Sequence, residues 1–129
     1  MYTVVAGIDS DKERARAQAE TIADMPMDTE EIEVVLTHSF EENRSGASVA
    51  QVSSVQRAQS VLEDAEIDVI LEEAGSDDPA ATVLNFADEY DADLVAVAGR
   101  KRSPTKKVVF GSVSQEIILN THRPVLVCE

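Results

Sequence analysis

Five short runs of β-branched and small apolar residues alternate with segments of helical periodicity along this chain. The apolar runs predict strands over residues 2–8, 31–40, 68–73, 94–98 and 125–127. The intervening segments, in which apolar residues recur every three or four positions, predict helices over residues 11–24, 49–65, 80–90 and 112–120. Because strands separated by helices pair in parallel through right-handed crossovers, the alternation predicts an α/β fold.

The common arrangement for five such strands is an open parallel sheet of order 3-2-1-4-5 with helices on both faces. Ligands bind such sheets at the carboxyl ends of the strands, where the order reverses, which is between the first and fourth strands here. The loops that follow those two strands are residues 7–11 and 99–111, so we expect them to face each other across a crevice. With no linker or internal repeat, residues 1–129 are expected to form a single domain.

The loop after the fourth strand is basic and is bounded by glycines at residues 99 and 111. Its cationic side chains are those of Arg100, Lys101, Arg102, Lys106 and Lys107. A strand, a glycine, a cationic loop and a Gly-Ser helix start together favour phosphate binding, because backbone N–H groups and the helix dipole point at the anion. A basic surface loop with no ligand is the alternative interpretation.

The charge is divided unevenly along the chain. Residues 1–98 hold 23 acidic and 5 basic side chains, whereas residues 99–129 hold 2 and 6, and the net charge is −14. A basic island on an acidic protein favours a small anion and disfavours DNA or RNA, whose phosphates the remaining surface would repel. The pI of about 4.4 is typical of a halophilic protein from a high-salt cytoplasm; an acidic surface on a mesophilic protein is the alternative.

The remaining residues give little sign of a disulfide, a membrane segment, a metal site or a catalytic histidine. Cys128 is the only cysteine, and the sequence has no apolar run of membrane length and no leader at its start, so we expect a cytoplasmic protein without a membrane partner. The acidic pairs lack convergent metal-ligand spacing, so no tightly bound metal is expected. His38 ends an apolar run with no nucleophile in register, which favours a histidine satisfied within the fold over a catalytic one.

Over its whole length the chain resembles the universal stress proteins. Their fourth strand is followed by a glycine, two residues, a glycine, nine residues, and a glycine with serine or threonine. Gly99 matches the first glycine and Gly111-Ser112 match the last pair, whereas Arg102 replaces the second glycine and the loop is one residue short. Residues 92–95 and 123–127 also fall in the family's order.

The resemblance implies a Rossmann-like fold of the adenine nucleotide alpha hydrolase type with a nucleotide site. The implied nucleotide-binding residues are Asp9, Ser39, Ala98, Gly99, Arg100, Arg102, Lys106, Gly111, Ser112 and Val113. By this matching, Asp9 lies at the adenosine end, and Ser39 contacts adenine where relatives carry an aliphatic residue. Ser112 reaches the phosphates. On physical grounds, the five basic side chains of the loop can neutralise a triphosphate and partly replace the contacts of the missing glycine; they are Arg100, Lys101, Arg102, Lys106 and Lys107.

The function implied by the resemblance is a cytoplasmic, homodimeric stress-response protein that holds ATP, with or without Mg²⁺, and signals through its conformation. The dimer is expected to form through the last strand, residues 125–127. Two alternatives stay open. A nucleotide-free interaction module is favoured by the altered loop, and an adenine-nucleotide hydrolase is disfavoured because residues 7–10 are not rich in glycine and serine. Any ATP hydrolysis is expected to be slow, because no positioned base is evident.

Overall fold

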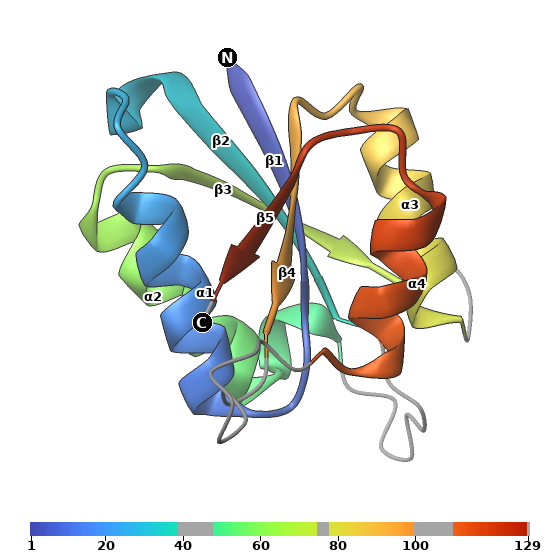
Figure 1. Ribbon diagram of the computed structural model, residues 1–129. Coiled ribbons are helices and arrows are strands. Elements are labelled where there is room, and N and C mark those ends of the chain that lie inside the picture. Colours follow the sequence, from blue (N-terminus) through green and yellow to red (C-terminus); the bar gives the residue numbers. More distant parts are fainter. Residues whose placement is uncertain (39–47, 75–77, 100–109, 129) are drawn as a thin grey trace, which may run out of the picture.

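The computed structural model describes residues 1–38, 48–74, 78–99 and 110–128 (Figure 1). Within these residues one parallel sheet has the strand order β3-β2-β1-β4-β5. The strands are β1 (Tyr2–Ile8), β2 (Ile32–His38), β3 (Asp68–Glu73), β4 (Leu94–Ala98) and β5 (Val125–Cys128). The predicted α/β class and strand order are therefore confirmed.

Two helices cover each face of this sheet. The helices are α1 (Lys12–Ala23), α2 (Ser53–Asp64), α3 (Pro79–Glu89) and α4 (Ser112–Asn120), and two 3₁₀ turns are η1 (Thr29–Glu31) and η2 (Val49–Gln51). Figure 1 shows α1 and α2 together on one side of the sheet and α3 and α4 on the other. The amino ends of α1, α3 and α4 follow the carboxyl ends of β1, β3 and β4, so all three lie toward the same edge of the sheet.

The sheet has a hydrophobic core on each side, because alternate residues of a strand point to opposite faces. Val4, Ala6 and Ile8 of β1 belong to the core beneath α1 and α2. Val5 belongs to the core beneath α3 and α4, together with Val83. This burial on both faces explains why the strands read as continuous apolar runs in the sequence.

Aspartates begin two of the helices. The Asp11 carboxylate accepts the backbone N–H of Arg14 at 2.9 Å and caps α1. The Asp78 carboxylate accepts the N–H of Ala81 at 3.2 Å and caps α3, whose first residue is Pro79. Each carboxylate satisfies an N–H group that has no partner within its helix.

One predicted helix is divided in the structure. The segment 49–65 forms the turn η2 and then the helix α2, because Val52 between them has an extended backbone, with φ −76° and ψ 123°. Val52 packs against the core beneath α1 and α2 in this conformation, which β-branched residues favour. The second strand was predicted over residues 31–40; it begins one residue later, at Ile32, and residues 39 and 40 lie outside the described residues.

No helix within the described ranges is long and apolar enough to cross a lipid bilayer. Cys128 is buried at the end of β5, and burial raises the pKa of its thiol to about 12. The thiol is therefore protonated and unreactive at neutral pH.

Candidate functional site

A cavity of about 630 Å³ opens where the carboxyl ends of β1 and β4 separate. Its lining comes from these two strands, the amino-terminal parts of α1 and α4, and two residues of α3. The lining residues are Gly7, Ile8, Asp9, Ser10, Asp11, Arg14, Pro79, Val83, Ala96, Val97, Ala98, Gly111, Ser112, Val113, Ser114 and Ile117. The volume lies within the range of small-molecule sites, about 300–1,000 Å³.

The cavity begins where the pairing of β1 with β4 ends. The last paired residues are Ala6 and Ala96, and beyond them the two strands are joined by a side chain from α1. The buried amide of Gln18 donates to the carbonyl oxygens of Gly7 at 3.3 Å and Ala96 at 3.0 Å. Gln18 thus satisfies backbone acceptors at the point where the sheet opens.

Two further side chains hold the end of β1. Nδ1 of the buried His38 lies 2.5 Å from the carbonyl oxygen of Ile8, and a carbonyl only accepts, so this nitrogen carries the proton. Ser54 Oγ donates to the carbonyl oxygen of Asp9 at 2.5 Å. Burial lowers the pKa of His38, which favours a neutral ring. One ring nitrogen of His38 is thus bonded within the fold, which agrees with the prediction of a structural histidine.

The wall formed by β1 and α1, called here the acidic wall, consists of Asp9, Asp11 and Arg14. The Asp9 carboxylate accepts the Asp11 N–H through Oδ1 at 2.8 Å and the Arg14 Nε–H through Oδ2 at 2.8 Å. Hydrogen bonding by the Arg14 N–H lowers the pKa of the Asp11 carboxyl. This wall offers carboxylate oxygens, which accept hydrogen bonds from hydroxyl and amino groups.

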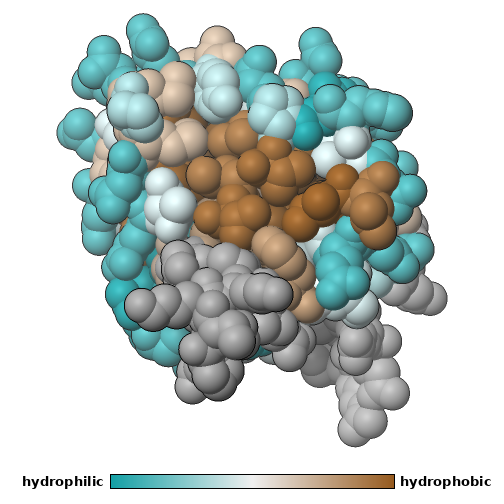
Figure 2. All heavy atoms as spheres, in the orientation of Figure 1, coloured by the Kyte–Doolittle hydropathy of each residue, from teal (hydrophilic) through white to brown (hydrophobic). Residues whose placement is uncertain are grey.

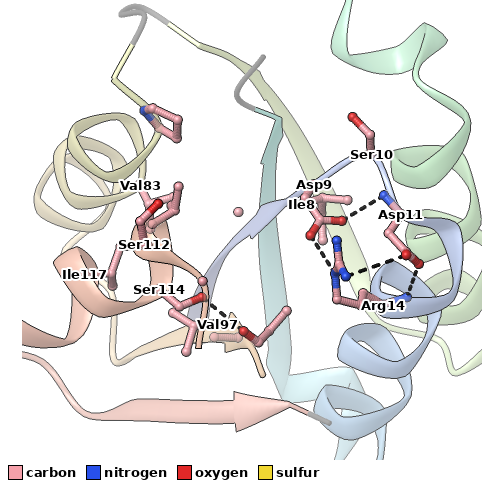
Figure 3. Close-up of a pocket in the computed structure, with 16 residues that line it drawn as sticks. Ile8, Asp9, Ser10, Asp11, Arg14, Val83, Val97, Ser112, Ser114 and Ile117 are labelled. Carbon is pink, nitrogen blue, oxygen red and sulfur yellow. Dashed lines mark hydrogen bonds and ion pairs between the residues drawn. The ribbon is translucent and has the colours of Figure 1, made fainter. Parts of the chain in front are cut away.

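The opposite wall, called here the helix wall, is the amino end of α4. Its N-cap residue is Gly111, which has no side chain to take up the N–H groups of the first turn, and Ser112 is exposed beside it. The Ser114 hydroxyl does not cap the helix, because its Oγ donates to the carbonyl oxygen of Ala98 at 3.0 Å. Figure 3 shows Ser112 and Ser114 across the cavity from Asp9, Asp11 and Arg14. A helix amino end of this kind attracts an anion.

A glycine at the floor of the cavity allows close packing. A Cβ atom on Gly7 would lie 2.6 Å from Cγ2 of Val83. Such a distance is far below van der Waals contact, so a larger residue at position 7 would push α3 away from β1. Gly7 therefore keeps α3 against the sheet beside the site.

The structure brings together about half of the residues predicted for the nucleotide site. Asp9, Ala98, Gly111, Ser112 and Val113 all line the cavity. Gly99 is buried and is not among the described lining residues; its N–H donates to the carbonyl oxygen of Cys128 at 2.7 Å. The remaining predicted residues, Ser39, Arg100, Arg102 and Lys106, lie outside the described residues.

Sequence reasoning missed three residues of this region. Arg14 was not identified, although its position three residues after the N-cap Asp11 is a spacing that brings opposite charges together on a helix. Gln18 was also missed; a polar residue among Ala15, Ala19 and Ile22 on the buried face of α1 was the signal. Nothing in the sequence around Ser54 indicates its bond to Asp9.

Within the described part of the chain, no group of three or more histidine, cysteine or acidic side chains is arranged to hold a metal ion. The acidic wall holds two carboxylates, and Arg14 pairs with both of them, at 2.8 Å to Asp9 and 3.6 Å to Asp11. The described lining therefore favours a ligand with hydroxyl or amino groups at one end and an anion at the other.

Comparison with known proteins matched the whole chain, residues 1–129, to the family described as "Universal stress protein family". The "Stress response protein NhaX" of Bacillus subtilis (strain 168) is 28% identical over 86 residues, which cover 67% of this chain and 48% of that protein. The "Universal stress protein" of Mycolicibacterium smegmatis is 29% identical over 80 residues, which cover 62% of each. The alignments thus span about half to three fifths of the length of these relatives.

Solved structures share the fold over nearly the whole chain. A universal stress protein from Archaeoglobus fulgidus superposes with a TM-score of 0.72 at 24% identity, covering 100% of this chain and 99% of that one. One from the same organism, solved in complex with dAMP, gives 0.73 at 19% identity, covering 100% and 98%. A universal stress protein in complex with cAMP gives 0.69 at 18% identity, covering 98% and 95%.

Proposed function

Because this chain belongs to the universal stress protein family, we propose that it binds an adenine nucleotide in the cavity between β1 and β4. The observation that carries the proposal is the pairing of two unlike walls across about 630 Å³. The helix wall offers backbone N–H groups at Gly111 and Ser112 to an anion. The acidic wall offers the carboxylate of Asp9 to hydroxyl or amino groups, and nucleotides carry both kinds of group.

The two walls favour one orientation of the proposed nucleotide. The phosphates lie at the amino end of α4, where the dipole is favourable and Gly111 allows close approach. The sugar and base lie toward Asp9, because a phosphate there would meet two carboxylates. Ala98 and Val113 line the same cavity, and their apolar side chains can contact the nucleoside.

ATP, with or without Mg²⁺, is the nucleotide we propose for this site. Two proteins of the same fold were solved in complex with dAMP and cAMP, which supports an adenine nucleotide as the ligand. The step to a triphosphate rests on the sequence, in which five basic residues lie between Gly99 and Gly111. Their charges match a polyphosphate better than a monophosphate.

Titration calorimetry of the purified protein with ATP, AMP, cAMP and GTP tests this proposal. We expect binding of the adenine nucleotides, with ATP the tightest, and weaker binding of GTP. Mass spectrometry of small molecules released by denaturation identifies the ligand that the protein carries from the cell. An absence of heat at millimolar ATP, together with no released nucleotide, would contradict the proposal.

A nucleotide-free member of the family is the second candidate. Arg102 in place of a glycine and the shortened loop favour it, because arginine does not take up glycine's positive-φ geometry freely. Such a protein would act as a cytoplasmic interaction module in the stress response. The same calorimetry separates the two candidates.

We further propose that the protein is a homodimer in the cytoplasm, paired through β5. This strand lies at the edge of the sheet, next to β4 only, and Val125, Leu126 and Val127 are half-buried. Figure 2 shows apolar side chains gathered on the face around β5, and Leu119 of α4 is 81% exposed. An open edge with apolar side chains favours pairing with a second copy about a twofold axis.

Light scattering of the wild type and of Leu126→Pro at micromolar concentration tests the dimer. Leu126 packs against the core and pairs with Ala96 of β4, so proline there should weaken β5 itself and leave the variant monomeric or aggregated. Leu119→Ser tests whether the exposed apolar side chain of α4 contributes to the same interface. A monomeric wild type in both dilute and molar salt would contradict the dimer.

A further inference from the structure

Arg14 is the one cation among the described residues that line the cavity. It lies in the first turn of α1, and its side chain is 34% exposed. Its Nε donates to Oδ2 of Asp9 at 2.8 Å, and its Nη1 lies 3.6 Å from Oδ2 of Asp11. Figure 3 shows the Arg14 side chain beside both carboxylates.

The Asp9 carboxylate is anchored at both oxygens as a result. Oδ1 accepts the Asp11 N–H at 2.8 Å, and Oδ2 accepts the Arg14 Nε–H at 2.8 Å. An ionised carboxylate has about four acceptor positions, so two remain for a ligand. Asp9 is 46% exposed and lines the cavity, so these positions are accessible.

A guanidinium in a nucleotide cavity could instead contact phosphate, but its position here argues against that role. Arg14 already pairs with two carboxylates on the acidic wall, whereas the anion-binding amino end of α4 forms the other wall. If the Arg14 guanidinium moved away from Asp9 to contact a phosphate, the Asp9 carboxylate would lose its cationic partner. The pairing favours a role that acts through Asp9.

We propose that Arg14 is a positioning residue: it fixes the orientation of the Asp9 carboxylate and so sets the affinity for the nucleoside end of the ligand. This inference rests on the proposed nucleotide binding. Held by two donors, Asp9 loses little rotamer freedom when a ligand hydroxyl or amino group binds. Preorganisation of this kind raises affinity by lowering the entropy cost of binding.

The same helix supplies a matched control. Arg16 makes two ion pairs of 2.8 Å, with Glu13 and Glu20, but does not line the cavity. Arg14→Gln and Arg16→Gln each remove one positive charge from α1, so they change the net charge of the protein equally. Only the first frees Asp9.

The experiment compares the wild type, Arg14→Gln and Arg16→Gln by calorimetry with adenosine, ATP and inorganic tripolyphosphate. We expect Arg14→Gln to lower the affinities for adenosine and ATP by the same factor, about three- to tenfold, as for the loss of one partly exposed charged hydrogen bond. Tripolyphosphate affinity should fall no more in Arg14→Gln than in Arg16→Gln, which loses the same charge, and Arg16→Gln should bind adenosine as the wild type does. In an Asp9→Asn background, Arg14→Gln should lower the adenosine affinity little further, because the carboxylate that Arg14 positions is already gone.

Two results with a wild type that binds ATP would overturn the inference. Unchanged adenosine affinity in Arg14→Gln would mean that Asp9 needs no positioning. A loss of tripolyphosphate affinity larger than that of Arg16→Gln, or a loss clearly larger for ATP than for adenosine, would make Arg14 a phosphate contact. A wild type that binds no adenine nucleotide would instead refute the proposed function. The melting temperature of each variant without ligand checks its fold. If Arg14→Gln does not fold, Arg14→Lys replaces it in the experiment; this variant keeps the charge and should retain part of the adenosine affinity.

Discussion

The two walls of the cavity are both built at helix amino ends, yet they differ in how those ends are satisfied. At α1 the Asp11 carboxylate accepts the first-turn N–H of Arg14, and Asp9 and Arg14 form an ion pair in front of it. At α4 the N-cap is Gly111, which offers no side chain to the first turn. One helix end is occupied by the protein's own carboxylates; at the other, no side chain of the described residues caps the first turn, and we propose that the ligand binds there.

The difference teaches how one fold can select a molecule with two unlike ends. A helix end closed by its own aspartate attracts little further negative charge, and here it presents acceptors to hydroxyl and amino groups. A helix end begun by glycine keeps its attraction for anions. Substitutions confined to one wall should therefore affect one end of the ligand, which makes the comparison open to direct test.

The largest effect is expected at the helix wall. Gly111→Val should lower the affinity for ATP by about 100-fold or more and abolish the ATP-dependent rise in melting temperature, because a branched side chain blocks the phosphates from the N–H groups. Valine fits the backbone, since Gly111 has φ −73° and ψ 167°, an extended conformation.

Thermal unfolding with and without ATP measures this effect, and Gln115→Val on the same helix, outside the cavity, is the control. The unliganded variant should melt close to the wild type. An ATP response equal to that of the wild type would show that the anion does not lie at α4.

The second prediction concerns the other glycine of the cavity. Gly7→Ala should lower the free energy of unfolding by about 1–3 kcal/mol, because its Cβ would overlap Val83, whose branched side chain has little rotamer freedom. Denaturant titration measures the loss.

A double-mutant cycle with Val83→Ala isolates this contact. In that background Gly7→Ala should cost much less, because the clashing methyl group is gone. An equal cost in both backgrounds would mean that Gly7 is required for another reason. The contact with Val83 would then not account for the glycine at position 7.

At the acidic wall a smaller and more selective effect is expected. Asp9→Asn keeps the shape of the side chain but removes its charge, and should weaken adenosine about tenfold, as for one charge-assisted hydrogen bond. Tripolyphosphate should bind as well as before or slightly better, because a nearby negative charge is lost. Calorimetry with these two ligands gives both values. Weaker binding of tripolyphosphate alone would reverse the assignment of the walls.

The smallest effect extends the comparison from the two walls to the whole surface. With a net charge of −14, repulsion among the acidic residues destabilises the fold in dilute buffer. Raising the salt from 0.01 M to 1 M shortens the range of this repulsion from about 30 Å to about 3 Å. We therefore expect the urea midpoint of unfolding to rise in molar potassium chloride, and a lower midpoint would argue against the halophilic interpretation.

Much of this fold could be predicted from the sequence because its signals are local. The runs at 68–73 and 94–98 coincide with β3 and β4, and residues 112–120 coincide with α4. Strand order then brought Asp9 and Gly111 to one crevice, although 102 positions separate them in the sequence. The periodicity failed at Val52, where packing of one side chain overrides a helical pattern.

The parts of the site that could not be predicted depend on contacts between distant elements. Gln18 bonds to carbonyl groups of β1 and β4, and Ser54 bonds to the carbonyl of Asp9. A backbone carbonyl is present at every residue, so sequence alone does not say which one a buried side chain will reach. The pair of Asp9 with Arg14 depends on how the chain turns into α1, which neither a strand nor a helix pattern describes.

The three side chains that hold the end of β1 also bear on the order in which the molecule assembles. Gln18, His38 and Ser54 reach the carbonyls of Gly7, Ile8 and Asp9 over separations of 11, 30 and 45 residues. All three precede β4 in the chain, so during synthesis, which proceeds from the amino terminus, they are available before the helix wall has been made. We expect the nucleoside half of the cavity to form in the nascent chain first, with each longer loop adding a modest entropy cost. The phosphate half would be completed last, when α4 docks.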